Sequence, residues 1–207
     1  FGKRSIQADM STLDMDGLHI TDQQHLIDAL KVYDAIANDA TVDFFLDGDE
    51  NGEFVMDAEA TAAYEARVAD AENKITFKLS TDPATQCDAV KFVSTTETEV
   101  PTALKFGTAT PVKFAGLWKY SDSKTFDYIA SLEVVEGATM TMTNMITATA
   151  TNPATTAITN NGTVNISGAT TLKLNMTNNG VIDIPVGAEF LMNGAELTNN
   201  ATSLEVY

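Results

Sequence analysis

Two neighbouring stretches of the sequence, ITNNGTVNISGATTLKLN at residues 158–175 and TNNGVIDIPVGAEFLMNGAE at residues 177–196, follow one pattern. Each has a Thr-Asn-Asn-Gly turn, a short alternating apolar segment, a Gly-Ala pair and a second apolar segment. Asparagine and glycine suit such corners because both tolerate the left-handed backbone conformation. The repeat therefore predicts strands that turn at equivalent corners and stack on one another.

The same features recur elsewhere in the second half of the chain. Gly-Ala pairs begin at residues 137, 168 and 187, and Asn-Asn pairs begin at residues 160, 178 and 199. The period is close to 20 residues once the Thr- and Ala-rich insert at 146–157 is set aside. Parallel strands about 4.8 Å apart place like residues over like, so this period indicates a parallel stack.

Short segments in which apolar residues flank a polar one predict the strands of this stack. They lie at residues 75–79, 90–92, 104–106, 112–114, 132–134, 164–166, 182–184 and 204–206. Few of the intervening gaps have the two residues of a tight hairpin. The intervals in the middle of the chain are short for a three-sided coil, so an irregular path and antiparallel strands are the two alternatives between 80 and 130.

The N-terminal third has a different pattern. The stretch 20–39 predicts an amphipathic helix with Thr21 as its N-cap, and residues 58–72 predict a second helix with Asp57 as its cap. Between the two helices, residues 41–57 alternate on both sides of Asn51-Gly52. This alternation favours a β-hairpin.

The repeated units, together with the early helix and the following TVDFFLD at 41–47, resemble right-handed parallel β-helix proteins exported by Bacteroides-type gut bacteria. Many of those are lipoproteins or adhesin-like surface proteins. The resemblance implies an all-β solenoid, a single-stranded right-handed parallel β-helix with an N-terminal amphipathic capping helix. We therefore divide the chain into an N-terminal segment with the capping helix, 1–40, and a solenoid, 41–207, which together make effectively one domain.

The resemblance also implies a non-catalytic, secreted protein at the extracellular or bacterial outer-membrane surface, with a glycan or a cell-surface protein as its partner. The principal alternative is a polysaccharide lyase or glycoside hydrolase, because many β-helix proteins act on carbohydrates. Residues 73–207 contain no arginine and only scattered acids, which disfavours both chemistries. A third alternative is an assembly subunit that associates through its terminal strand.

The amino-acid composition and net charge argue against some classes of binding partner. The 207 residues carry a net charge of -17, with 17 acids against 4 bases in residues 1–72. Such a surface repels phosphate backbones and anionic lipids, so we expect no nucleic-acid partner. No apolar run reaches the roughly 18 residues of a membrane span. The single Cys87 excludes an intramolecular disulfide, and the start at Phe1 suggests a processed piece.

No residue is assigned a catalytic, cofactor-binding or metal-binding role. The loop DGDENGE at 47–53 resembles the start of a calcium loop, but Ala58 stands where the twelfth position requires glutamate. We expect a plain acidic turn there, with calcium as the alternative. His19 and His25 are six residues apart, a spacing that does not place them on one helical face, and we expect no zinc site.

Two further groups have a structural and a binding interpretation. Lys91, Lys105 and Lys113 are expected on a solvated sheet face, with an anionic-sugar site as the alternative. The aromatic residues near Trp118 are expected to cover the core, with a sugar platform as the alternative. They are Trp118, Tyr120, Phe126 and Tyr128. The Asn-x-Ser/Thr sequons reflect composition, and they lie at Asn161, Asn165, Asn175 and Asn200.

Overall fold

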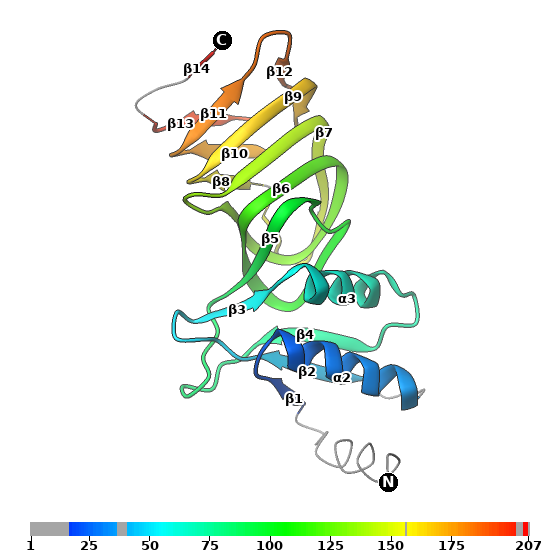
Figure 1. Ribbon diagram of the computed structural model, residues 1–207. Coiled ribbons are helices and arrows are strands. Elements are labelled where there is room, and N and C mark those ends of the chain that lie inside the picture. Colours follow the sequence, from blue (N-terminus) through cyan, green and yellow to red (C-terminus); the bar gives the residue numbers. More distant parts are fainter. Residues whose placement is uncertain (1–16, 37–40, 156, 202–204, 207) are drawn as a thin grey trace.

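The computed structural model describes residues 17–36, 41–155, 157–201 and 205–206 (Figure 1). Within these ranges the strands form two parallel sheets, and two helices pack beside them. The smaller sheet has three strands in the order β1 (Leu18–Ile20), β2 (Val42–Leu46) and β4 (Ile75–Leu79). The larger sheet has eleven strands and curls into a half-barrel.

The larger sheet takes its shape from two long, bent strands, β6 (Ala103–Val134) and β7 (Thr139–Thr151). Their pairing slips near Asp122 and Asn144, where φ is +64° and +62°. Such bulges bend a strand without ending it. The other strands are β3 (Glu53–Met56), β5 (Ala89–Glu99), β8 (Ala157–Asn160), β9 (Thr163–Leu172), β10 (Asn175–Asn178), β11 (Val181–Ile184), β12 (Glu189–Met192), β13 (Leu197–Asn199) and β14 (Glu205–Val206).

The expected all-β solenoid is wrong, because the fold is mixed α/β. Two helices and a separate small sheet occupy the N-terminal part of the described chain. The predicted segments 104–106, 112–114 and 132–134 are all parts of the single bent strand β6. Sequence alternation marks each segment, but the chain runs through all three as one strand, with a register shift near Asp122.

The antiparallel alternative for residues 80–130 is also wrong. Every strand pair between described residues is parallel. The end of β6 returns beside its own first half, since the Val135 N–H donates to the Phe114 carbonyl at 3.1 Å. The predicted strand 204–206 is described only at 205–206, where β14 pairs with β11.

The predicted hairpin at 41–57 is wrong as well. Gly52 does turn the chain, with φ +71° and its N–H donating to the Asp49 carbonyl. However, β2 pairs with β1 and β4 in the small sheet, whereas β3 pairs with β5 in the large one. Alternation therefore identified both strands but not their partners, which lie 26 residues earlier in the case of β1 and 33 and 36 residues later in the cases of β4 and β5.

Both predicted helices are confirmed as α2 (Gln23–Ile36) and α3 (Ala58–Ala69). Asp57 caps α3 as predicted, because its carboxylate accepts a hydrogen bond from the Ala60 N–H. The cap of α2 is Asp22 rather than Thr21, since the Asp22 Oδ1 accepts from the His25 N–H at 2.9 Å. The prediction placed this cap one residue too early.

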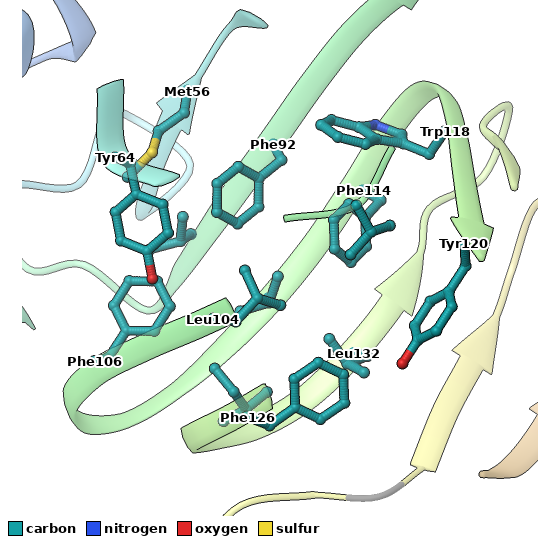
Figure 2. Close-up of a cluster of buried hydrophobic side chains, with 14 of the residues drawn as sticks. Met56, Tyr64, Phe92, Leu104, Phe106, Phe114, Trp118, Tyr120, Phe126 and Leu132 are labelled. Carbon is teal, nitrogen blue, oxygen red and sulfur yellow. The ribbon is translucent and has the colours of Figure 1, made fainter. Parts of the chain in front are cut away.

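Tyr64 of α3 contacts residues of both sheets, and Figure 2 shows it beside Phe106 of β6. Its ring stacks on Phe106 of β6 at 5.5 Å between centroids and meets Phe77 of β4 at 5.1 Å. Its buried hydroxyl donates to the Lys105 carbonyl and accepts from the Lys105 N–H, both at 2.9 Å. One side chain therefore packs against both sheets and satisfies two backbone groups of β6.

The prediction that like residues stack over like is confirmed in the last passes of the large sheet. Asn160, Asn178 and Asn199 occupy equivalent positions of β8, β10 and β13, and we call them the inner asparagine ladder. The Asn160 Nδ2 donates to the Asn178 Oδ1 at 2.7 Å, and the Asn178 Nδ2 donates to the Asn199 Oδ1 at 2.8 Å. Asn160 and Asn178 are fully buried, so the ladder supplies the partners that their amides need.

Glycine after each of the first two asparagine pairs allows this close stacking. A Cβ at Gly180 would lie 2.1 Å from the Gly162 carbonyl oxygen. No residue with a side chain fits there without moving the backbone. The glycine of the Asn-Asn-Gly motif is thus required by the close stacking of successive turns.

Replacing Tyr64 with phenylalanine should destabilise the protein by about 2 kcal/mol or more, because two buried backbone groups of Lys105 lose their partner. Tyr120→Phe is the matched comparison, since the Tyr120 hydroxyl is bonded to one group, the Thr147 carbonyl. Urea unfolding followed by circular dichroism measures both changes. Equal losses in the two variants would contradict the special role of Tyr64.

Candidate binding surfaces

The predicted calcium-like loop, residues 47–53, borders a cleft of about 230 Å³. The cleft lies between the start of α2 and strand β3. Its lining combines acidic and amide side chains with a short apolar floor. The lining residues are Thr21, Asp22, Gln23, Asp47, Asp49, Glu53, Phe54 and Val55.

Two carboxylates of this loop, those of Asp47 and Asp49, bind groups within the protein. The Asp47 Oδ1 lies 2.6 Å from the His19 Nδ1, and the Asp49 Oδ1 accepts from the backbone N–H groups of Asn51 and Glu53. Burial raises the pKa of Asp49, but these backbone hydrogen bonds outweigh it and hold the pKa below its ordinary value. Throughout the described ranges, no group of three or more His, Cys, Asp or Glu residues is placed to hold a metal ion.

Glu53 connects β3 to two lysines of the predicted row. Lys91 and Lys113 are neighbours on β5 and β6, and their Nζ atoms lie 3.0 and 2.7 Å from the two Glu53 oxygens. Burial raises the pKa of Glu53, but the hydrogen bonds from Lys113 and Lys91 outweigh it and lower the pKa overall. The hydrogen bond to Glu53 likewise raises the pKa of Lys113.

The lysine row is therefore only partly as predicted. Lys91 and Lys113 lie side by side with side chains 30% and 31% exposed, while Lys105 lies apart beside Tyr64. One carboxylate shared by two ammonium groups leaves the pair with a small net positive charge. The arrangement braces three strands, β3, β5 and β6, across the outer face of the sheet.

The histidines and the cysteine occupy separate places. The His19 ring stacks on Phe45 at 5.6 Å, and the His25 Nδ1 accepts from the Thr21 N–H at the start of α2. Burial raises the pKa of the Cys87 thiol to about 11, so it stays protonated at neutral pH. The thiol donates to the Ala89 carbonyl at 3.3 Å.

The aromatic cluster is part of the core, as expected, and the sugar-platform alternative is wrong for its buried members. Trp118, Tyr120 and Phe126 are almost completely buried (Figure 2). The Trp118 Nε1 donates to the Ala115 carbonyl, and the Tyr120 hydroxyl donates to the Thr147 carbonyl. Their polar atoms are thus used inside the protein.

Sequence reasoning missed an outward array formed by the Thr-Asn-Asn repeats. Two columns flank the inner asparagine ladder, and we call them the Thr/Asn face. The face consists of Thr159, Thr177 and Thr198, with Asn161, Asn179 and Asn200 beside them. The repeated Thr-Asn-Asn sequence could have indicated this array. However, side-chain alternation places the threonine and the second asparagine on the outer face only once the first asparagine is known to point inward.

The outer asparagines form a second ladder. The Asn179 Nδ2 donates to the Asn161 Oδ1 at 2.8 Å, and the Asn200 Nδ2 donates to the Asn179 Oδ1 at 3.0 Å. The Asn161 Nδ2 donates in turn to the Glu133 Oε1. All six side chains are partly or fully exposed, so the face presents ordered amide and hydroxyl groups to solvent.

The Thr/Asn face lies in a nearly neutral part of the chain. Residues 137–207 contain one lysine and four acids, whereas the whole chain carries -17. The acidic residues are concentrated at the opposite end, in residues 1–72. The face therefore has hydrogen-bonding capacity without a strong electrostatic preference.

Comparison with known proteins identifies no relative. No protein-family model, curated protein or solved structure matches the chain. None of the helices in the described residues is long and apolar enough to cross a membrane.

Replacing Glu53 with glutamine should lower the free energy of unfolding at pH 7 by about 1–3 kcal/mol, because a charge-assisted contact to two lysines is lost. The folded-state pKa of Glu53 lies below the unfolded value, so its contribution is complete above the unfolded pKa of about 4.3. That contribution disappears as pH falls through the folded pKa. Urea unfolding between pH 3 and pH 7 should show the wild-type advantage shrinking at acid pH.

Glu136→Gln is the control for this measurement, because Glu136 is exposed and lies outside the lysine pair. It should change stability by less than about 0.5 kcal/mol at either pH. A Glu53→Gln penalty that persists unchanged at pH 3 would show that its cause is packing and not charge.

Proposed function

We propose that this protein is a non-catalytic extracellular surface protein, adhesin-like in action, that binds a neutral glycan through the Thr/Asn face. The face presents one hydroxyl and one amide on each of three successive strands. The resemblance noted in the sequence supports a location at the bacterial outer-membrane surface. This regular outward array is the observation that carries the proposal.

The chemistry of the face suits sugar hydroxyls. Threonine hydroxyls donate and accept hydrogen bonds, and asparagine amides offer donors and an acceptor. Each Thr/Asn pair can therefore bond to a sugar hydroxyl that acts either as donor or as acceptor. Neighbouring strands repeat the same groups about every 4.8 Å. A linear polysaccharide lying across the strands would meet equivalent partners at each step.

The face is also held rigidly. The fully buried Asn160 and Asn178 fix the strands beneath it, and the outer amides are already ordered by their contacts to one another. Ordered groups lose less conformational entropy when a ligand binds. Pre-organisation of this kind favours binding through many individually weak hydrogen bonds.

The environments of two carboxylates support the non-catalytic part of the proposal. A glycosidase acid needs a raised pKa, but Lys113 and Lys91 contribute to lowering the pKa of Glu53. The Glu99 Oε1 accepts from the Lys124 ammonium at 2.6 Å and from the Ser121 hydroxyl at 2.9 Å. Both carboxylates bind cationic or hydroxyl groups of the protein itself.

A glycan array on the purified protein tests the proposal, followed by titration of the best ligand. The Thr177→Ala/Asn179→Ala double variant removes the central pair of the face and leaves the buried Asn178 in place. It should weaken binding at least about tenfold, because two ligand hydrogen bonds are lost. Thr147→Ala/Thr149→Ala on β7 is the matched control and should bind like the wild type.

A second readout separates binding from catalysis. The same panel of neutral and acidic polysaccharides is incubated with the protein, and reducing ends and unsaturated-uronate absorbance are measured. We expect neither to increase. New ends would contradict the non-catalytic function, and equal binding by both double variants would exclude the Thr/Asn face as the site.

A further inference from the structure

Asparagine followed directly by glycine occurs four times in the chain. The pairs are Asn51-Gly52, Asn161-Gly162, Asn179-Gly180 and Asn193-Gly194. Glycine has no Cβ, so its backbone nitrogen can approach the side-chain carbonyl carbon of the preceding asparagine and attack it. Whether a pair reacts in the folded protein depends on whether that nitrogen and that side chain are held by other groups.

Three of the four glycine nitrogens are held in hydrogen bonds. The Gly52 N–H donates to the Asp49 carbonyl at 2.9 Å. The Gly162 N–H donates to the Asn160 Oδ1 at 3.1 Å, and the Gly180 N–H donates to the Asn160 carbonyl at 3.0 Å. Each of these bonds must open before the nitrogen can attack, so the folded structure protects these three pairs.

The asparagine side chains of the two ladder pairs are held as well. The Asn161 Nδ2 donates to the Glu133 Oε1 at 2.7 Å, and the Asn161 Oδ1 accepts from Asn179 at 2.8 Å. The Asn179 Oδ1 accepts in turn from Asn200 at 3.0 Å. Attack requires the amide to rotate toward the following glycine, and this rotation would break the outer ladder.

Asn193-Gly194 is held by none of these contacts. Among the described residues, neither the Gly194 N–H nor the Asn193 side chain has a hydrogen-bond partner. Both residues are exposed, in the connection between β12 and β13. Beyond its chain neighbours, no described heavy atom lies within 4 Å of the position that a Cβ of Gly194 would take. The Asn193 amide therefore has room to turn toward the Gly194 nitrogen.

The exposure of Asn193 follows from the direction of its column in the sheet. Leu172 of β9 pairs with Met192 of β12, so Lys173 and Asn193 occupy equivalent places after them. Their N–H groups also bond in the same way, to the carbonyls of Ile146 and Leu172. Lys173 is exposed although β12 packs beside β9, so this place faces solvent even where a further strand follows.

We propose that Asn193 is a site of spontaneous modification, at which water converts the asparagine to aspartate and isoaspartate. The Gly194 nitrogen gives up its proton and forms a bond to the Asn193 Cγ. The bond from Cγ to Nδ2 breaks, and Nδ2 takes up a proton and leaves as ammonia. Water then opens the cyclic imide at either carbonyl carbon, which restores the N–H and produces a carboxylate. The reaction requires only water and does not depend on the proposed glycan binding.

The modification changes the connection into β13. Isoaspartate adds one carbon to the main chain between residue 193 and Gly194. The Asn193 N–H is bonded to the Leu172 carbonyl at 3.0 Å, and the Glu196 N–H is bonded to the Asn175 Oδ1 at 2.9 Å. The additional carbon and the new negative charge therefore fall between two points at which the chain is anchored to the preceding strands.

Mass spectrometry of the full chain after incubation at mildly alkaline pH tests the site. Cleavage after glutamate releases FLMNGAE, residues 190–196, which contains Asn193, and a separate peptide, residues 137–189, which contains both ladder pairs. In the folded protein, the mass increase from replacing NH2 with OH should appear in 190–196 at least about tenfold faster than in 137–189. In concentrated urea the pairs should react at similar rates, because the protecting hydrogen bonds are lost.

Asn193→Gln is the variant that assigns the reaction to this residue, because the longer side chain forms the cyclic imide far more slowly. It should abolish the mass increase in 190–196, leave the rate in 137–189 unchanged and unfold in urea like the wild type, since Asn193 is exposed. Equal rates in the two peptides of the folded chain would overturn the proposal. A folded chain that stays unmodified at Asn193 while the urea-unfolded chain reacts would overturn it equally.

Discussion

A buried amide must find a hydrogen-bond partner inside the protein, and here the partner is the same residue of the next strand. Asn160 and Asn178 are fully buried and bonded to one another. Shifting one strand by a residue would place a threonine in the interior and send the asparagine to solvent. The inner asparagine ladder therefore fixes the register, and the exposed Thr/Asn face follows from that register.

The two ends of the molecule differ in chemistry because different interactions hold them together. At the N-terminal end, aromatic rings around Tyr64 join the small sheet to the large one, and acids predominate in the sequence. At the C-terminal end, amides and hydroxyls predominate and charge is sparse. Negative charge therefore predominates at one end and neutral hydrogen-bonding groups at the other.

The sequence predicted those features that depend on local pattern. Both helices and the Asp57 cap were predicted, because each is encoded within a few neighbouring residues. The stacking of the asparagine pairs was predicted from their repeat at intervals of 18 and 21 residues. The hairpin prediction was wrong because the alternation of residues 42–46 and 53–56 identifies two strands but does not indicate which distant strand each of them pairs with. The fold class was wrong because the resemblance implied an all-β solenoid, whereas two helices and a separate small sheet occupy the N-terminal part of the described chain.

The candidate surfaces were harder to predict than the fold. The motifs that stood out, namely the acidic loop, the lysines and the aromatic cluster, are largely engaged within the protein. The Thr/Asn face contains ordinary polar residues, whose meaning depends on which neighbours point inward. That information is present only once the pairing of strands is known.

Hydrogen exchange of the asparagine side-chain amides, followed by nuclear magnetic resonance, tests the central claim most directly. The account predicts that the Nδ2 protons of Asn160 and Asn178 exchange orders of magnitude more slowly than those of the exposed Asn193, because they are buried and bonded. Equally fast exchange at all three residues would show that no buried ladder sets the register.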